Sequence, residues 1–169
     1  MFGYREYPSL IKGGHASYQF DIDSEMVRSS ETQVNIMIGL NHHVFEHNIP
    51  EVKPGGVLIH SSPAWKFTPE QQKMIKERKI SIIFMPIDEI LAKMNAKPIL
   101  GNVVLTAFVW AMLEQDKEML KEMVGERFAH KKDVLALNMQ CIDRGYDYED
   151  KTHGKIRIKL PEAKKKWKN

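Results

Sequence analysis

The sequence predicts an α/β fold: a three-layer α/β/α arrangement around a mixed, mostly parallel sheet. Three short apolar segments, residues 34–40, 57–60 and 79–85, have the length and composition of buried strands. Polar or amphipathic stretches separate these segments, and the second half of the chain has helical periodicity. Strands that alternate with helices favour parallel pairing, with helices on both faces of the sheet.

Local signals predict the elements between these strands. Thr68 followed by Pro69 is typical of a helix start, and this helix is expected to run to about Arg78. Residues 87–94 carry apolar side chains at helical spacing and predict a second helix. The Pro-Gly-Gly sequence at residues 54–56 predicts a turn that leads into the strand at 57–60.

The second half predicts three helices, at residues 102–113, 116–125 and 131–144. The first of these is apolar on nearly every side and is therefore expected to be buried, with Asn102 as its N-cap. Apolar residues alternate with polar ones at residues 16–23 and 155–160. These two segments are expected to be antiparallel additions that make the sheet mixed.

Length and composition favour one globular domain. We predict a single α/β domain over residues 1–160, followed by a basic tail or linker at 161–169. The chain lacks a run of roughly 18–20 apolar residues, so no membrane association is expected. Its first residues lack the apolar centre of a signal peptide, which predicts a cytoplasmic protein.

Cysteine content and charge exclude several functions. Cys141 is the only cysteine, so the chain cannot form an internal disulfide or ligate an iron–sulfur cluster by itself. The helical pattern around it predicts a buried thiol. Residues 155–169 hold seven basic and one acidic residue, so they contribute +6 to a net charge of +3 and the rest contributes −3. This short run favours a solvated end over nucleic-acid binding.

The first candidate site is the loop Lys12-Gly13-Gly14-His15. Paired glycines let a backbone approach a ligand closely, and the two flanking side chains favour an anion. A tight turn that needs small residues is the alternative interpretation. The chain holds no G-x-G-x-x-G sequence, which argues against a dinucleotide-binding enzyme.

Other polar residues follow predicted strands or begin helices. Asn41 comes directly after an apolar strand, and Asn102 begins the most apolar helix, where an anion could also bind. His43 and His47 have the spacing of two metal ligands on a helix, but no third ligand stands nearby. We therefore favour a surface or capping role for both histidines.

Several segments together carry a family resemblance. They are Tyr7-Pro8-Ser9-Leu10-Ile11-Lys12-Gly13-Gly14-His15, residues 35–41, residues 53–59, the Asn102 helix, and residues 128–138 with Gly145-Tyr146. Their order and spacing resemble the gamma domain of 2-oxoacid:ferredoxin oxidoreductases over nearly the whole chain. Lys12 stands where that family usually has Arg. Domains of this family normally begin with a strand, a Gly-rich loop and a helix before this motif. The resemblance therefore implies an N-terminally shortened domain or a fragment, or that another chain supplies these elements.

The resemblance implies a function in a larger enzyme. Such enzymes oxidatively decarboxylate a 2-oxoacid to acyl-CoA and reduce ferredoxin. Thiamine diphosphate, Mg and iron–sulfur clusters are expected in partner subunits and none in this chain, with coenzyme A as co-substrate. The implied partners are alpha, beta and ferredoxin-like delta subunits. This chain would be non-catalytic alone. Lys12, Gly13, Gly14 and His15 would face coenzyme A or a partner subunit, with Asn41 and Asn102 behind them.

A different class of function stays open. Without the family's first strand and helix, the sheet would expose an unpaired edge and apolar surface. The chain would then be a non-enzymatic α/β module that binds no substrate and forms homo-oligomers. We expect a homo-oligomer for the isolated chain under either interpretation.

Overall fold

The computed structural model describes residues 1–6, 17–40, 45, 48–130, 132–152 and 158–161. The chain divides into two compact units. The sheet unit comprises residues 1–60, 64–82 and 160–169, and the helical unit comprises residues 61–63 and 83–159. The single domain boundary expected at residue 160 stays a prediction.

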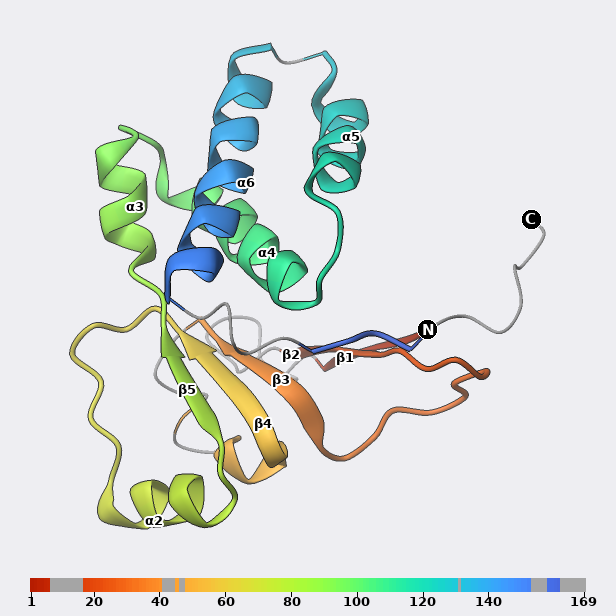
Figure 1. The fold of residues 1–169 in the computed structure, drawn as a ribbon, viewed down its shortest axis with the longest axis vertical. Coiled ribbons are helices and arrows are strands. Elements are labelled where there is room, and N and C mark those ends of the chain that lie inside the picture. The colour runs from red at the N-terminus through yellow and green to blue at the C-terminus, as the bar shows by residue number, and fades with distance from the viewer. Residues whose placement is uncertain (7–16, 41–44, 46–47, 131, 153–157, 162–169) are drawn as a thin grey trace. The chain divides into compact units, whose positions relative to one another are not determined.

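A parallel sheet forms the centre of the sheet unit. It contains β3 (Val34–Gly39), β4 (Val52–His60) and β5 (Ser81–Phe84) in the order β3-β4-β5 (Figure 1). β3 and β4 pair in parallel, with Met37 opposite Leu58. All three predicted strands and the α/β class are confirmed, but β3 is only partly buried, because Ile38 is 39% exposed.

The predicted Pro-Gly-Gly turn is wrong, because these residues lie inside β4 as an irregularity in its pairing. Between the pairs Val34–Val52 and Ile36–Val57, β3 advances by two residues while β4 advances by five. Gly55 adopts a φ of 77°, which lets the strand bend without ending. The strand therefore begins before the bend and continues after it.

One face of this sheet packs on a helix that the sequence predicts correctly. α2 (Pro69–Glu77) begins at Thr68, whose backbone N–H donates to Gln71 Oε1 at 2.9 Å, while the Gln71 backbone N–H donates to Thr68 Oγ1 at 3.3 Å. This reciprocal pair satisfies two free donors of the helix end. The core beneath it consists of Phe45, Ile49, Val52, Leu58 and Ile80, with Met74 and Ile75 of α2 against them.

A separate two-stranded ribbon lies at the start of the chain. β1 (Phe2–Glu6) and β2 (Ser17–Asp21) pair antiparallel, from Phe2 opposite Asp21 to Glu6 opposite Ser17. The strand predicted at 16–23 is confirmed. The expected single mixed sheet is wrong in this respect, because the antiparallel strands hydrogen-bond to each other and form a sheet of their own.

The predicted C-terminal strand has little support. Residues 155–157 lie outside the described part of the chain, and residues 158–161 carry no strand assignment. The backbone N–H of Ile158 donates to the carbonyl of Met112 at 2.9 Å, which ties this segment to the end of a helix. A single hydrogen bond of this kind does not make a strand, so the predicted strand is wrong for the described residues.

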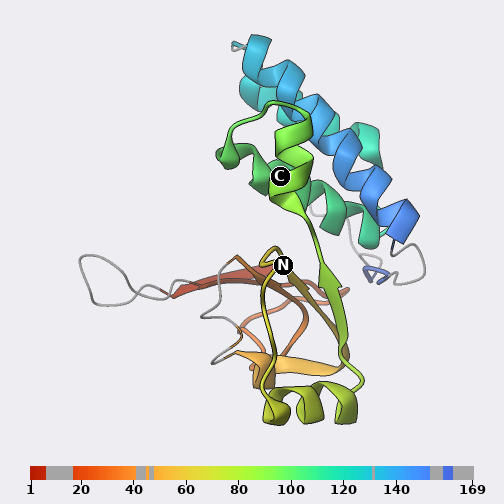
Figure 2. The same ribbon diagram turned by 90° about the vertical axis from the view of Figure 1, so that its left-hand side faces the viewer.

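The helical unit contains α3 (Ile87–Lys93), α4 (Gly101–Met112), α5 (Lys117–Phe128) and α6 (Lys132–Thr152), with a 3₁₀ turn at Pro98–Leu100 (Figure 2). The four predicted helices are confirmed, although α6 is two turns longer than expected. Ala107, Leu120 and Ile142 form a hydrophobic core cluster of the helical unit. Cys141 is fully buried, as predicted, and burial raises the pKa of its thiol.

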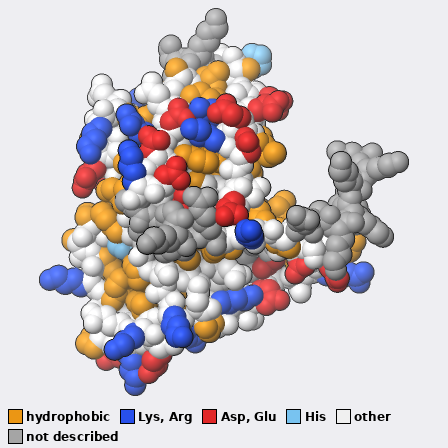
Figure 3. All heavy atoms as spheres, viewed as in Figure 1, with side chains coloured by type: hydrophobic (Ala, Val, Ile, Leu, Met, Phe, Trp, Pro, Cys, Tyr) orange, Lys and Arg blue, Asp and Glu red, His pale blue; other side chains and the backbone are white. Residues whose placement is uncertain are grey.

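The surface of the helical unit carries interspersed acidic and basic side chains (Figure 3). Asp143 of α6 accepts from Lys121 Nζ at 2.8 Å and lies 3.4 Å from Lys117 Nζ, so it links α6 to α5. Nearby, the Tyr146 hydroxyl donates to the carbonyl of Gln115 at 2.7 Å. Burial, with a smaller contribution from the charge of Asp116, raises the pKa of Tyr146 to about 12.

The buried Tyr146 predicts how stability depends on alkaline pH. An unfolded tyrosine has a pKa of about 10, so the folded state holds this proton more tightly. The stabilisation is therefore complete below pH 10 and is lost as the pH rises from about 10 towards 12. We expect Tyr146→Phe to be less stable than wild type at neutral pH and to lose less stability above pH 10, measured by urea unfolding. Parallel losses in the two proteins would contradict this.

Candidate functional site

The ribbon carries the Gly-Gly loop of the sequence prediction. Lys12, Gly13, Gly14 and His15 lie outside the described residues, on the connection between β1 and β2. That connection leaves β1 after Glu6 and enters β2 at Ser17, and these two residues are opposite each other in the ribbon. The ribbon therefore fixes both ends of the candidate loop at adjacent positions.

A second candidate region is the carboxyl end of the parallel strands. Asn41 lies outside the described residues but follows Leu40 directly after β3. Gly39 at this end is opposite His60, the last residue of β4. Open α/β sheets bind their ligands outside the carboxyl ends of the strands. This edge is consequently where the sheet unit would place a ligand.

His60 is the polar side chain that the sequence analysis missed at this edge. It is buried, and its ring meets Phe45 edge-on at 5.3 Å and Phe67 at 6.3 Å between centroids. Trp65 completes the cluster by lying 4.5 Å from Phe45. An imidazole can donate and accept hydrogen bonds. His60 therefore places a hydrogen-bonding ring among aromatic side chains. The sequence signal for this residue was its position directly after the apolar strand residues Val-Leu-Ile.

The prediction for Asn102 is wrong in its structural role. α4 begins at Gly101, one residue earlier, with Leu100 as its N-cap and without a side-chain capping bond. The preceding 3₁₀ turn runs directly into the helix, so no extended residue needs a cap. Asn102 is exposed, and its carbonyl accepts from Thr106 Oγ1 at 2.7 Å. It belongs to the helical unit, whereas Asn41 belongs to the sheet unit.

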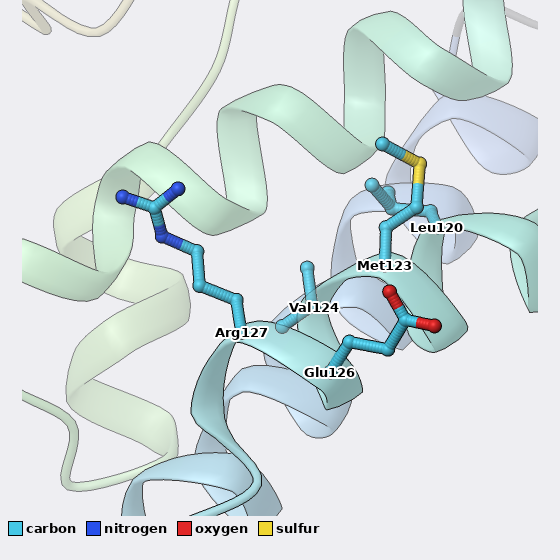
Figure 4. Close-up of a pocket in the computed structure, with 5 residues that line it drawn as sticks. All are labelled: Leu120, Met123, Val124, Glu126 and Arg127. Atoms are coloured by element: carbon cyan, nitrogen blue, oxygen red, sulfur yellow. The ribbon is translucent and has the colours of Figure 1, made fainter. Parts of the chain in front are cut away.

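The helical unit has a hollow of its own beside α5. It measures about 490 Å³ and is lined by Leu120, Met123, Val124, Glu126 and Arg127 (Figure 4). Two of the lining side chains, Glu126 and Arg127, are charged, and the other three are apolar. An apolar hollow with one carboxylate and one guanidinium lacks the paired acid, base or nucleophile that catalysis needs.

The described residues support neither a metal site nor a membrane-spanning helix. These residues contain no group of three or more His, Cys, Asp or Glu side chains that could hold a metal ion. His43 and His47 lie outside this part of the chain. In the same described segments, no helix has the length and apolar character that crossing a membrane requires.

The chain is similar to known proteins over most of its length. Residues 1–148 match the family model described as pyruvate ferredoxin/flavodoxin oxidoreductase. Subunit alpha of 2-oxoacid:ferredoxin oxidoreductase 2 from Aeropyrum pernix is 23% identical over 199 residues. The match covers 95% of this chain and 31% of the relative. The chain thus spans about a third of that relative's length.

A solved structure has the same fold. It is 2-oxoglutarate:ferredoxin oxidoreductase from Magnetococcus marinus, with 2-oxoglutarate, coenzyme A and succinyl-CoA bound. The TM-score is 0.69 at 20% sequence identity, and the match covers 95% of this chain and 28% of the other. The similarity of fold agrees with the family match over residues 1–148. The chain belongs to the pyruvate ferredoxin/flavodoxin oxidoreductase family.

Proposed function

We propose that this chain is the gamma-type part of a 2-oxoacid:ferredoxin oxidoreductase, working in the cytoplasm. The enzyme would oxidatively decarboxylate a 2-oxoacid to acyl-CoA and reduce ferredoxin. The observation that carries the proposal is the family match over residues 1–148. The order of motifs across the chain adds the gamma assignment, and the relative named subunit alpha contains a corresponding segment within a longer chain.

Decarboxylation and electron transfer would take place in other chains. Thiamine diphosphate and Mg would be held by the alpha and beta subunits, and iron–sulfur clusters by these or a ferredoxin-like delta subunit. A cluster needs several cysteine ligands, and this chain offers only Cys141, which is buried in the helical unit. We therefore assign no catalytic residue to this chain and propose that it supports assembly and borders the coenzyme A site.

The coenzyme A contact is proposed for the loop carried by the ribbon. Lys12 would pair with a phosphate, and the backbone N–H groups of Gly13 and Gly14 would approach it closely because no side chains intervene. His15 would add a second donor. The ribbon supports this role because it holds the two ends of the loop at the paired residues Glu6 and Ser17. Coenzyme A is bound in the Magnetococcus marinus enzyme of the same fold.

Kinetics of the assembled enzyme test this assignment. Lys12→Ala is expected to raise KM for coenzyme A roughly tenfold, the effect of losing a charged hydrogen bond, and to leave kcat unchanged. Lys12→Arg is expected to keep the wild-type KM, because it preserves the charge and adds a second donor. Lys53→Ala, which removes a partly exposed lysine of β4, serves as the control. An unchanged KM in the Lys12→Ala enzyme would contradict the contact.

The second candidate function is a self-associating module without substrate. The observation in its favour is an exposed apolar face on the β1–β2 ribbon, which includes Tyr18 and Phe20. Such a module would bind neither coenzyme A nor oxidoreductase subunits. The two proposals therefore separate by whether larger subunits purify with the chain.

A further inference from the structure

The first half of α5 is anchored to the rest of the helical unit by polar contacts. Just before the helix, the Gln115 carbonyl accepts from the Tyr146 hydroxyl at 2.7 Å. Inside the helix, Lys117 Nζ and Lys121 Nζ lie 3.4 Å and 2.8 Å from Asp143 Oδ1 of α6. Three contacts with α6 therefore hold residues 115–121.

The start of this helix is also closed and packed. Asp116 caps it by accepting from the Met119 backbone N–H at 2.9 Å, and the Asp116 carbonyl accepts from Trp110 Nε1 at 3.0 Å. Leu120 belongs to the hydrophobic core cluster and is the buried residue of α5. Capping, packing and ion pairs thus coincide in the same half of the helix.

The second half of α5, residues 122–128, lacks contacts of this kind. Within the described part of the chain, its charged side chains make no hydrogen bond or ion pair: Glu122, Glu126 and Arg127. Met123 is 54% exposed. The hollow of about 490 Å³ lies along this half, because four of its five lining residues are at positions 123–127 (Figure 4). Val124 is the side chain from this half that packs on the core cluster.

The sequence of this half also weakens it as a helix. Glycine is the least favourable residue of a helix interior after proline. Neither crowding nor a positive φ requires Gly125, because a Cβ there meets only Met139 Cε, at 3.9 Å. Glu122 and Glu126 are four positions apart, where like charges repel, and the helix dipole disfavours an acid near the C-terminal end.

We propose that residues 122–128 form a hinged flap, which unfolds locally from α6 and returns while residues 115–121 stay bound. Segments with few buried contacts open at a lower free energy than the core of the same domain. α4 and α6 form that core, because they pack on each other more extensively than either packs on α5. The hinge lies after Lys121, where the polar contacts end.

Opening of the flap changes the surface of α6. In the closed state, Val124 packs on the core cluster and Gly125 lies next to Met139. In the open state these contacts are lost, so the apolar Met139 side chain becomes accessible while the ion pairs of Asp143 persist. The flap is therefore a conformational device that exposes apolar surface reversibly, and it does not depend on the oxidoreductase assignment.

Native-state hydrogen exchange of the full chain at neutral pH, resolved by residue, tests the proposal. Amides of residues 125–128 and of residues 139–145 both lie inside helices, so both sets are hydrogen-bonded. After correction for intrinsic rates, the flap amides are expected to exchange roughly 100-fold faster than those of α6, because they exchange without unfolding of the unit. Equal protection of the two sets would overturn the proposal.

Two substitutions locate the hinge. Tyr146→Phe removes a hydrogen bond that the closed and open flap share. It is expected to speed exchange at residues 139–145 roughly fivefold, the effect of one lost hydrogen bond, and to leave residues 125–128 unchanged. Val124→Ala is the matched variant inside the flap, and it is expected to speed both sets by one common factor, because opening releases Val124. Equal acceleration of both sets by Tyr146→Phe would show that all of α5 opens together and would overturn the hinge.

Discussion

Gly145→Ala is expected to lower the free energy of unfolding of the helical unit by about 3 kcal/mol, near the upper end for an overpacked core. A Cβ at this position of α6 would lie 2.6 Å from Ala107 Cβ and from the Val104 carbonyl oxygen, and 2.9 Å from the Phe108 nitrogen. Two of these three atoms belong to the backbone of α4, where neither can shift alone without breaking helical hydrogen bonds. The methyl group would therefore force α4 and α6 apart.

Gly125→Ala provides the matched control on α5. A Cβ there meets only Met139 Cε, at 3.9 Å, which is ordinary van der Waals contact. Alanine favours the helix over glycine by roughly 0.8–1 kcal/mol, so this variant is expected to be more stable than wild type. Urea unfolding followed by the fluorescence of Trp110 measures both, with the other two tryptophans replaced by Phe. Equal effects of the two substitutions would contradict the close approach of α4 and α6.

Gly56→Ala is expected to destabilise the sheet unit by about 2 kcal/mol, again through overpacking. A Cβ at Gly56 would lie 2.8 Å from the Lys53 carbonyl oxygen and from Val52 Cγ1, and 2.9 Å from the Asn35 carbonyl oxygen. Two of these contacts are with backbone atoms, on β4 itself and on β3. The side chain would therefore disturb the pairing of the two strands at the irregularity in β4.

The neighbouring glycine separates crowding from backbone strain. A Cβ at Gly55 meets nothing within 4 Å, but its φ of 77° is unfavourable for any residue with a side chain. Gly55→Ala is expected to cost about 1 kcal/mol, and Gly55→Asn less, because Asn tolerates positive φ. Trp65 fluorescence reports on this unit when Trp110 and Trp167 are replaced by Phe. A larger loss for Gly55→Ala than for Gly56→Ala would contradict the crowding argument.

The sequence predicted the elements whose periodicity reflects burial. The strands around Leu58 and Ile83 are short apolar runs with fully buried residues, whereas β3 has a similar run but leaves Ile38 39% exposed. α2 begins with a capping pattern between Thr68 and Gln71, three positions apart. These signals are local, so they can be read without knowing the fold. Cys141 was likewise placed correctly, because its neighbours repeat at helical spacing and its own burial follows.

Features that depend on pairing partners were harder to predict. The Pro-Gly-Gly sequence is a common turn signal, and only the register with β3 reveals that β4 continues through it. β1 was missed because five residues at a chain end carry a weak alternation, and its identity as a strand depends on pairing with β2. Asn102 was predicted as a cap because the preceding 3₁₀ turn leaves no clear sequence signal.

The candidate site was predicted through motif order, not through local chemistry. Paired glycines are common in turns, so Lys12-Gly13-Gly14-His15 gains a functional meaning only from the other family segments along the chain. The structure adds that this sequence connects the paired strands β1 and β2. His60 escaped notice because a buried histidine at a strand end is recognised by its aromatic neighbours Phe45 and Phe67, which lie on other segments and reach it only in the folded chain.

Anaerobic affinity purification of the tagged chain from its native host tests the central claim most directly. The retained material is assayed for thiamine diphosphate and iron, and its subunits are identified by mass spectrometry. The proposed oxidoreductase predicts larger subunits that carry both cofactors, and 2-oxoacid-dependent reduction of a viologen dye in the presence of coenzyme A. Recovery of the chain alone, free of both cofactors, would contradict the proposed function.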